Sequence, residues 1–312
     1  MHRLAWLVVA CVACAGVAAA AVEIDKAQGL YEGTVGDQKA EARLVAVKEG
    51  FKLLIRPLDK DSTAPKIELN GKVEGDSIVL SGGGAEAKWG DFAVSGKAGD
   101  KAIQLKRVER LSPTLGLKPP AGAVVILDGK NFDELVKKPL KGGQEQEWKI
   151  VEEGAIQVPK GGMNSKRQFA GSFKYHVEFR CPLMPPATSQ GRGNSGCFLP
   201  NGEEIQVLDS FGMNTYTGGG CGGLYKYKDP DTFDVFSLAS APPLQWQTYD
   251  VEYRVEVKDG KPTGKPRLTV LHNGIKIHDN VELRREAKPG NLNWQDHGNP
   301  VCYRNIWVLE EK

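Results

Sequence analysis

Hydrophobic and polar residues alternate in short runs along most of the chain. The runs at residues 42–58, 66–82 and 92–108 are separated by Gly, Asn and Asp, which are turn-forming residues. Alternation with a period of two is typical of β-strands that bury one face. This pattern predicts a small antiparallel β domain over residues 22–110.

A second region of alternating runs covers residues 123–312 and follows a stretch rich in Pro and Gly at residues 111–122. We interpret that stretch as a linker between two domains. Helical periodicity is scarce, and one or two helical turns are expected at residues 131–138. So many short strands predict an all-β fold, with a two-sheet sandwich of the jelly-roll kind in the second domain.

The dipeptide Asn273-Gly274 is a strong signal for a two-residue hairpin turn. Pairing outward from this turn sets His272 opposite Ile275. It sets His278 opposite Thr269, so the two imidazoles are expected on opposite faces of the sheet. The other histidines are far away in sequence, and no cysteine pair has the spacing of a zinc site. We therefore predict no metal site, with calcium as the alternative, since Asp, Asn and carbonyl oxygens are plentiful.

The first residues have the order of a secretory signal peptide: a basic residue, an apolar run and a series of small residues ending at Ala20 and Ala21. We expect cleavage near these alanines, which makes residues 1–21 a signal peptide and the protein periplasmic or secreted. An uncleaved anchor is one alternative, since the apolar run is nearly long enough to span a bilayer. A lipoprotein attached through Cys11 is a weaker one, since the apolar stretch before this cysteine is very short.

Charge narrows the class of partner. The chain has 41 Lys and Arg residues against 39 Asp and Glu residues, a formal net charge of +2. So small a net charge predicts neither nucleic acid nor an acidic membrane surface as a partner. An uncharged small ligand fits better.

Export would also set the chemistry of the cysteines. Cleavage leaves Cys181, Cys197, Cys221 and Cys302, which could form two disulfides in an oxidising compartment. The sequence does not select a pairing. Buried free thiols are the alternative for Cys181 and Cys197.

The candidate chemistry begins in the run "EEIQVLDS". Alternation sends Ile205 and Val207 toward the core, and it sends Glu204 and Gln206 to the opposite face. A bulge near the end of this strand would bring Asp209 beside the two polar side chains. The alternative is an exposed strand face that carries ordinary polar residues.

This strand is similar to the catalytic strand of laminarinase-type and lichenase-type glycosidases, which carries Glu, Asp and Glu. Here Gln206 takes the middle place and Asp209 the last. A retaining mechanism needs two carboxyl groups close together, so these substitutions put that chemistry in doubt.

Several further segments closely resemble the 3-keto-disaccharide hydrolase family and occur in the same order. They are "AVVILDGKNFDEL", "GRGNSGCF", "EEIQVLDSFG", "CGGLYKY", "PPLQWQTYDVEY", "VLHNGIKIHDNVEL" and "LNWQDHGNPVCYRNIWV". The resemblance covers about residues 123–312 and implies a concanavalin A-like jelly roll. It also implies an exported hydrolase that cleaves glycosides oxidised at carbon 3, with no cofactor and with a sugar oxidoreductase as pathway partner.

The ketone at carbon 3 acidifies the hydrogen on carbon 2, so a base can form an enolate that expels the group on carbon 1. Adding water afterwards gives net hydrolysis, and stopping earlier gives a lyase. Such a reaction needs a general base, a general acid at the leaving oxygen and donors that face the enolate.

Glu204 is the candidate base, because burial could raise its pKa toward neutrality. His297 is the candidate acid or proton shuttle, held by Asp296 or a neighbouring carbonyl, and a loop histidine that caps the last strand is its alternative. Asp209 could be a second acid, a calcium ligand or a turn former.

Substrate binding is assigned to neutral amides, one cation and aromatic rings. The amides of Gln206, Asn194 and Gln295 suit sugar hydroxyls or an enolate oxygen, or they could satisfy loop backbone. Arg192 would fix an anionic intermediate or form a surface ion pair. Tyr225 and Trp294 would stack on sugar faces.

Two non-enzymatic readings compete with this prediction. A lectin-like carbohydrate-binding module would use the same fold and the same polar residues without chemistry. A structural or matrix protein would use the N-terminal β domain for attachment and would lack a concave polar cluster.

Overall fold

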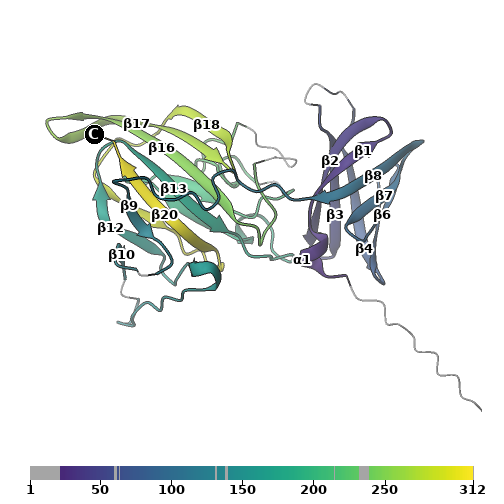
Figure 1. Cartoon of the computed structure of the whole chain (residues 1–312), viewed down its shortest axis with the longest axis horizontal. Helices are drawn as coiled ribbons and strands as arrows, with labels where there is room; N and C mark the ends of the chain where they lie inside the picture. The colour runs from purple at the N-terminus through teal and green to yellow at the C-terminus, as the bar shows by residue number, and fades with distance from the viewer. Residues whose placement is uncertain are drawn as a thin grey trace, which may run out of the picture.

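The structure is a computed structural model, and it describes residues 22–59, 62, 64–130, 132–137, 140–213, 215–231 and 239–311. The expected signal segment, residues 1–21, lies outside the described residues. The all-β prediction is confirmed: strands dominate both a small N-terminal body and a larger C-terminal one, which lie side by side (Figure 1). Within these residues, no helix is long and apolar enough to cross a membrane.

The N-terminal body is an antiparallel barrel, which closes because its first strand pairs with both its second and its last strand. Within the described residues it comprises the short helix α1 (Ile24–Ala27) and the strands β1 (Gly29–Val35), β2 (Gln38–Val47), β3 (Gly50–Pro57), β4 (Ile67–Glu74), β5 (Ser77–Gly82), β6 (Ala85–Gly90), β7 (Ala93–Ala98) and β8 (Lys101–Val108). Tyr31 fastens α1 to this barrel, because its hydroxyl donates to the Ala27 carbonyl at 2.5 Å and accepts from Trp89 Nε1 at 2.7 Å.

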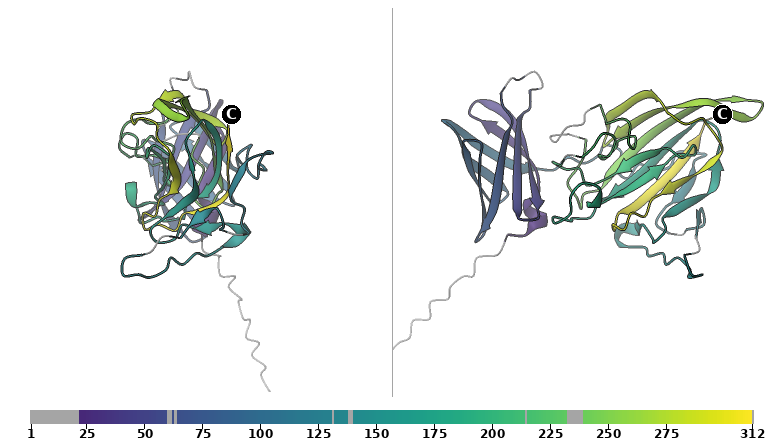
Figure 2. Two further views of the ribbon diagram at one scale, coloured as in Figure 1. Left: turned by 90° about the vertical axis from the view of Figure 1, so that its left-hand side faces the viewer. Right: turned by 180° about the vertical axis from the view of Figure 1, so that it is seen from behind.

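The C-terminal body is a sandwich of two antiparallel sheets (Figure 2). In the described residues, the five-stranded sheet has the order β10 (Leu135–Val136), β12 (Met163–Phe169), β19 (Gly290–Trp294), β14 (Ser195–Phe198), β15 (Glu204–Val207). The seven-stranded sheet has the order β11 (Ile156–Gln157), β20 (Cys302–Glu310), β13 (Phe173–Arg180), β16 (Gln247–Lys258), β17 (Lys261–His272), β18 (Ile275–Glu282), with β9 (Val124–Leu127) beside β20. Two short 3-10 helices, η1 (Glu152–Gly154) and η2 (Ser189–Gly191), lie in its loops.

Successive strands cross from one sheet to the other, as from β12 to β13 and from β19 to β20. Their inward faces form one apolar core, in which Phe173 stacks on Tyr253 with ring centroids 4.8 Å apart. The two sheets thus leave two outer faces, and the candidate site lies on the outer face of the five-stranded sheet.

The linker is not a free tether. Ser112 is buried and shares a hydrogen bond of 2.6 Å with Thr248, and the Gly116 N–H donates to Glu178 at 2.5 Å. The Leu117 carbonyl accepts from Asn305 Nδ2 at 3.0 Å. These contacts fix residues 112–117 across the outer face of the seven-stranded sheet, where Figure 1 shows the chain passing over β13 and β20.

The barrel and the sandwich touch through an apolar contact. Phe211 of the sandwich packs against Leu30 and Val45 on the outside of the barrel. The Arg43 guanidinium lies over the Phe211 ring at 5.5 Å from its centroid. This contact and the docked linker hold the two bodies together at separate points.

Two local predictions are corrected by the strand pairing. Leu135 pairs with Ser165, so residues 135–136 form a strand where helical turns were expected. His272 pairs with Ile275 as predicted, but His278 pairs with Val270, because irregularities in the β17–β18 register displace it.

Both of these imidazoles are buried. His272 Nε2 lies 2.9 Å from Gln247 Oε1, and His278 Nε2 lies 2.7 Å from the Gly222 carbonyl. Burial lowers the pKa of His272 to about 3, so this ring stays neutral. The described part of the chain contains no group of three or more His, Cys, Asp and Glu side chains that could hold a metal ion.

The cysteines of the described residues are free and buried, so the free-thiol alternative holds for Cys181 and Cys197 and neither possible disulfide is present among these residues. They are Cys181, Cys197, Cys221 and Cys302. Burial raises the pKa of the Cys197 thiol to about 12, so it packs as a small apolar side chain.

Candidate active site

The strand β15 separates core residues from site residues in the way that its alternation predicts. Ile205 and Val207 are fully buried in the sandwich core. Glu204 pairs with Phe198, and Gln206 pairs with Gly196 on the neighbouring strand β14. Glu204 and Gln206 therefore lie on the outer face of the five-stranded sheet.

A pocket of about 450 Å³ opens at the start of this strand. Strand β15, a tight turn after it and a loop that follows β18 all contribute to its wall. The lining residues are Phe198, Gly202, Glu203, Glu204, Tyr225, Lys226, Tyr227, Arg284 and Arg285. The volume and the mixture of aromatic and polar side chains suit a sugar.

Glu204 is 7% exposed, and within the described residues nothing forms a hydrogen bond with its carboxylate. Burial without compensation disfavours the charged form and raises the pKa of Glu204 to about 7. Gly196 makes room for this side chain, since a Cβ atom there would lie 2.0 Å from Glu204 Oε1. Gly196, the second glycine of the run "GNSGCF", is thus part of the candidate site.

Two tyrosines lie close to this carboxylate. The Tyr216 hydroxyl donates to the Tyr225 hydroxyl at 2.9 Å, and Tyr225 lines the pocket. The pKa of Tyr216 is raised to about 12 by burial, by its bond to Tyr225 and by the charge of Glu204. The Tyr216 hydroxyl therefore keeps its proton at neutral pH.

A cluster of buried amides extends from Gln206 away from the pocket. Gln206 Nε2 donates to Gln190 Oε1 at 2.8 Å, and Asn194 Nδ2 donates to the Gln190 carbonyl at 2.8 Å. The amide oxygens of Asn194 and Gln206 are buried and have no hydrogen-bond partner among the residues that the structure describes. An unmet acceptor of this kind is costly unless a ligand or water donates to it.

The pocket rim is built from residues that the sequence reasoning did not select. Glu203 accepts from the Tyr227 hydroxyl and, at 2.5 Å, from the Arg285 backbone N–H. The Arg284 guanidinium lies 4.7 Å from the Tyr227 ring centroid. The adjacent pair Arg284-Arg285 and the run "LYKY" were the available signals, but only the fold places them beside Glu204.

Arg192 and Asp209 are brought together, but away from the pocket. Arg192 Nε donates to Asp209 Oδ2 at 2.7 Å, and both side chains are fully buried. Burial raises the pKa of Asp209 to about 6, although the charge of Arg192 opposes this. The ion pair is buried and so is not the surface pair that was one alternative for Arg192. Asp209 also accepts from the Phe211 N–H at 3.2 Å, which agrees with its alternative as a turn former.

His297 does not join Glu204. Asn293 is level with Glu204 across the sheet, and His297 lies four residues further on in an exposed loop. His297 is therefore two strands away from Glu204 and beyond the end of β19. Asp296 does not hold the imidazole either, because its oxygens accept from the N–H groups of Gly161 at 2.9 Å and Gly298 at 2.8 Å.

Of the last two predicted binding residues, Gln295 lies next to the site and Trp294 lies in the core. The Gln295 N–H donates to the Gly196 carbonyl at 3.0 Å. Gln295 therefore lies beside Gly196, the residue against which the Glu204 carboxylate packs. Trp294 is fully buried in the core and donates to the Tyr175 hydroxyl at 2.9 Å. It cannot stack on a sugar, because its side chain points into the core and not to the outer face of the sheet.

Comparisons with known proteins identify a family and two similar crystal structures. The profile of the family described as "3-keto-alpha-glucoside-1,2-lyase-like domain" matches residues 122–309. A crystal structure of a "putative glycosyl hydrolase" from Parabacteroides distasonis is similar over 62% of this chain and 85% of its own, with 32% identity and a TM-score of 0.51. A second "putative glycosyl hydrolase" from that bacterium is similar over 61% and 95%, with 18% identity and a TM-score of 0.43. No curated protein matches the chain.

Proposed function

Because the chain belongs to the family of 3-keto-alpha-glucoside-1,2-lyase-like domains, we propose that it cleaves 3-keto-glycosides by an elimination that Glu204 starts. The family and the 32% identical neighbour mark it as a carbohydrate-active enzyme. One observation supports the finer proposal most: a buried carboxylate, unpartnered among the described residues and with a pKa of about 7, faces a sugar-sized pocket.

The proposed reaction starts at carbon 2 of the oxidised sugar. The Glu204 carboxylate takes the hydrogen on carbon 2 as a proton, and the electron pair that remains becomes an enolate with the carbon 3 ketone. The enolate returns its electrons to form the carbon 1–carbon 2 double bond and expels the glycosidic oxygen. If water then adds its oxygen to carbon 1 and a proton to carbon 2, the net reaction is hydrolysis. Without that addition the enzyme is a 1,2-lyase.

The pKa of Glu204 suits this role. A base with a pKa near the working pH is strong enough to take the proton and is still largely ionised. An ordinary surface glutamate is ionised but is a weaker base. Burial therefore supplies the basicity of Glu204.

We assign the acid role to the tyrosine pair in place of His297. Tyr225 lines the same pocket as Glu204 and is bonded to Tyr216. A phenol that stays protonated at neutral pH can donate to an expelled alkoxide, which is a stronger base than phenolate. Tyr216 can then return a proton to Tyr225.

Gln206, the next outward-facing residue after Glu204, would extend the sugar site, and the buried amide oxygens of Gln206 and Asn194 would accept hydrogen bonds from bound water. These amides also favour the second candidate function, a lectin-like module that binds the sugar without chemistry. Such a module would bind the sugar saturably and would release no product.

The wider setting is proposed on the same grounds. Export through the expected signal peptide would place the enzyme in the periplasm or outside the cell. A sugar oxidoreductase must then supply the ketone, because none of the steps above oxidises carbon 3.

The test is turnover of 3-keto-trehalose, 3-keto-lactose and a 3-keto aryl glucoside beside their unoxidised parents. We expect cleavage of the keto compounds only, and a loss of about a thousandfold or more in Glu204→Gln, as for removal of a general base. Glu286→Gln, at an exposed glutamate outside the pocket, is the matched control. Cleavage of the parents alone would indicate an ordinary glycosidase, and full activity of Glu204→Gln would remove this residue from the mechanism.

A further inference from the structure

We propose that the substrate's aglycone carries an anionic group, and that Arg284 and Arg285 hold that group in the pocket beside Glu204. The inference rests on the proposed function, and it names the class of substrate. It comes from the charges of the pocket, which the chemistry described above does not use.

Cations exceed acids in the pocket lining. Lys226, Arg284 and Arg285 face two carboxylates, Glu203 and Glu204. Glu203 is already satisfied by the Tyr227 hydroxyl and a backbone N–H. Glu204 is neutral for part of the time at neutral pH, since its pKa is about 7. The pocket is therefore electropositive where the protein as a whole is almost neutral.

Among the described residues, these cations also lack counter-ions. Over the residues that the structure describes, no carboxylate forms an ion pair with Lys226, Arg284 or Arg285. By contrast, Lys276 on strand β18, which precedes the loop of Arg284 and Arg285, does form an ion pair: its Nζ lies 3.0 Å from Asp279 Oδ2. An anion from outside the chain would complete the set.

The arginines are held in place before any ligand arrives. Arg285 Nη1 donates to the Gly202 carbonyl at 2.6 Å, and Arg284 stacks over Tyr227. Lys226 lies over the Tyr225 ring at 5.2 Å and has a φ of +65°, which fixes it in the tight turn. Guanidinium groups fixed in this way lose little entropy when they bind a carboxylate, sulfate or phosphate.

The two sides of Glu204 differ in chemistry, and this orients the substrate. Gln206, Gln190 and Asn194 lie on one side and offer neutral amides, which suit the hydroxyls of the keto sugar. The arginines lie on the other side, where the leaving group extends from carbon 1. The base is then between them, next to carbon 2.

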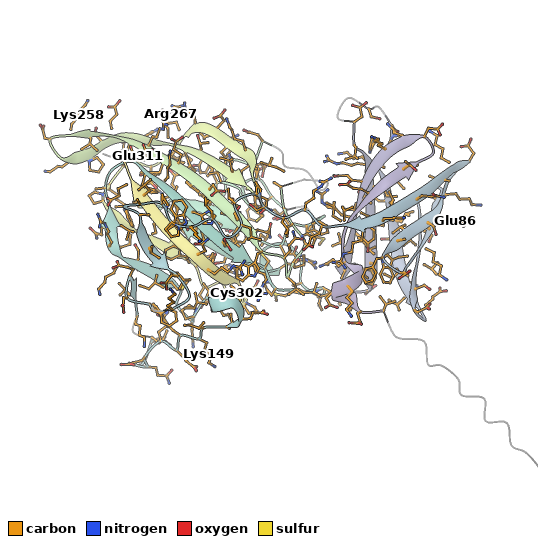
Figure 3. All side chains as sticks on the ribbon, in the orientation of Figure 1. Glu86, Lys149, Lys258, Arg267, Cys302 and Glu311 are labelled. Carbon is orange, nitrogen blue, oxygen red and sulfur yellow. The ribbon has the colours of Figure 1, made fainter. Side chains whose placement is uncertain are left out.

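The test compares two 3-keto-glucosides with leaving groups of nearly the same shape, 4-hydroxybenzoate and 4-hydroxybenzamide. The intact protein should show a kcat/KM about tenfold higher for the carboxylate compound, as expected for a few exposed charge contacts. This ratio should fall toward one in Arg284→Gln/Arg285→Gln and in high salt. The control is Arg254→Gln/Arg267→Gln, which removes the same charge outside the pocket; Arg267 is at the outer edge of the sandwich (Figure 3).

The outcomes separate this inference from the proposed function. Equal cleavage of both compounds would overturn the inference and leave the proposed function intact. A tenfold ratio that survives the double substitution, with both rates lowered alike, would also overturn it, because the arginines would then act on the shared keto sugar. If neither compound is cleaved, the proposed function fails, and calorimetric binding of the two unoxidised glucosides decides the inference: tighter binding of the carboxylate supports it, and equal binding overturns it.

Discussion

Two buried glutamates, one on each outer face of the sandwich, have opposite surroundings. Glu178, on the seven-stranded sheet, accepts from Arg304 Nε at 2.7 Å, Asn305 Nδ2 at 2.8 Å and the Gly116 N–H at 2.5 Å. Glu204, on the five-stranded sheet, has no such donor among the described residues. Burial alone would raise the pKa of both side chains.

The outcome differs because of these donors. Hydrogen bonds from His176, Asn305 and Arg304 overcome the effect of burial and lower the pKa of Glu178 to about 2, while that of Glu204 stays near 7. Glu178 is thus a structural anion that fastens the linker. Glu204 is a carboxylate that the fold leaves unpaired, as expected of a group that exchanges protons with a substrate.

The cluster around Glu178 is more extensive than a single pair. His176 Nδ1 lies 2.7 Å from Asp250 Oδ1, and Trp307 stacks on the His176 ring at 5.2 Å. Asp250 in turn accepts from Thr114 of the linker at 2.6 Å. Every polar group that is named here has a partner within the described residues.

The largest effect on stability should come from Glu178→Gln. It removes the buried charge that faces Arg304 and His176, and we expect the free energy of unfolding to fall by about 3 kcal/mol. Guanidinium unfolding followed by tryptophan fluorescence measures this, with the exposed Glu256→Gln as the control. An unchanged guanidinium concentration at the unfolding midpoint would mean that the Glu178 carboxylate is not stabilised by its partners in the way described.

A pH-dependent effect of opposite sign and similar size is expected for Glu204→Gln. The folded-state pKa of about 7 is above the ordinary value of 4.5, so wild-type stability falls as pH rises through this window. The variant does not have this penalty, because glutamine has no carboxyl group to ionise in the buried site. It should be about 3 kcal/mol more stable than the wild type at pH 8 and nearly equal to it at pH 4.

Guanidinium titrations of both proteins at the two pH values provide the measurement. The same difference at pH 4 and pH 8 would contradict a raised pKa for Glu204. A variant that is less stable at pH 8 would indicate that the carboxylate has a hydrogen-bond donor in the folded protein.

The smallest effect is expected for Gly196→Ala. The new Cβ would occupy the position of Glu204 Oε1, and the flexible carboxylate can move away without a shift of the backbone. We expect kcat/KM for a 3-keto-glucoside to fall about tenfold, with a melting temperature close to that of the wild type. Gly191→Ala, where the added atom meets nothing, is the control. Undiminished activity would show that the carboxylate does not need this position.

The sequence alone was sufficient wherever neighbouring residues decide the structure. The two-residue turn at Asn273-Gly274 forms as predicted, since both residues adopt a positive φ. Strand alternation correctly separated Ile205 and Val207 from Glu204, because successive side chains in a strand point to opposite faces.

The failures all depend on contacts between distant segments. Trp294 reads as a sugar-stacking residue until the register of β19 directs it into the core. Arg192 and Asp209 read as site residues until their buried ion pair is seen. The proline- and glycine-rich stretch reads as a tether until the network around Glu178 fixes it.

The amino-acid sequence by itself determined the all-β class and the alternation of the strand that carries Glu204, because period-two patterns and turn residues act over a few neighbours. Only the tertiary structure decided which glutamate is paired and which is left unpaired. That difference depends on donors that lie far away in the sequence, and strand register and loop docking bring those donors to one carboxylate and not to the other.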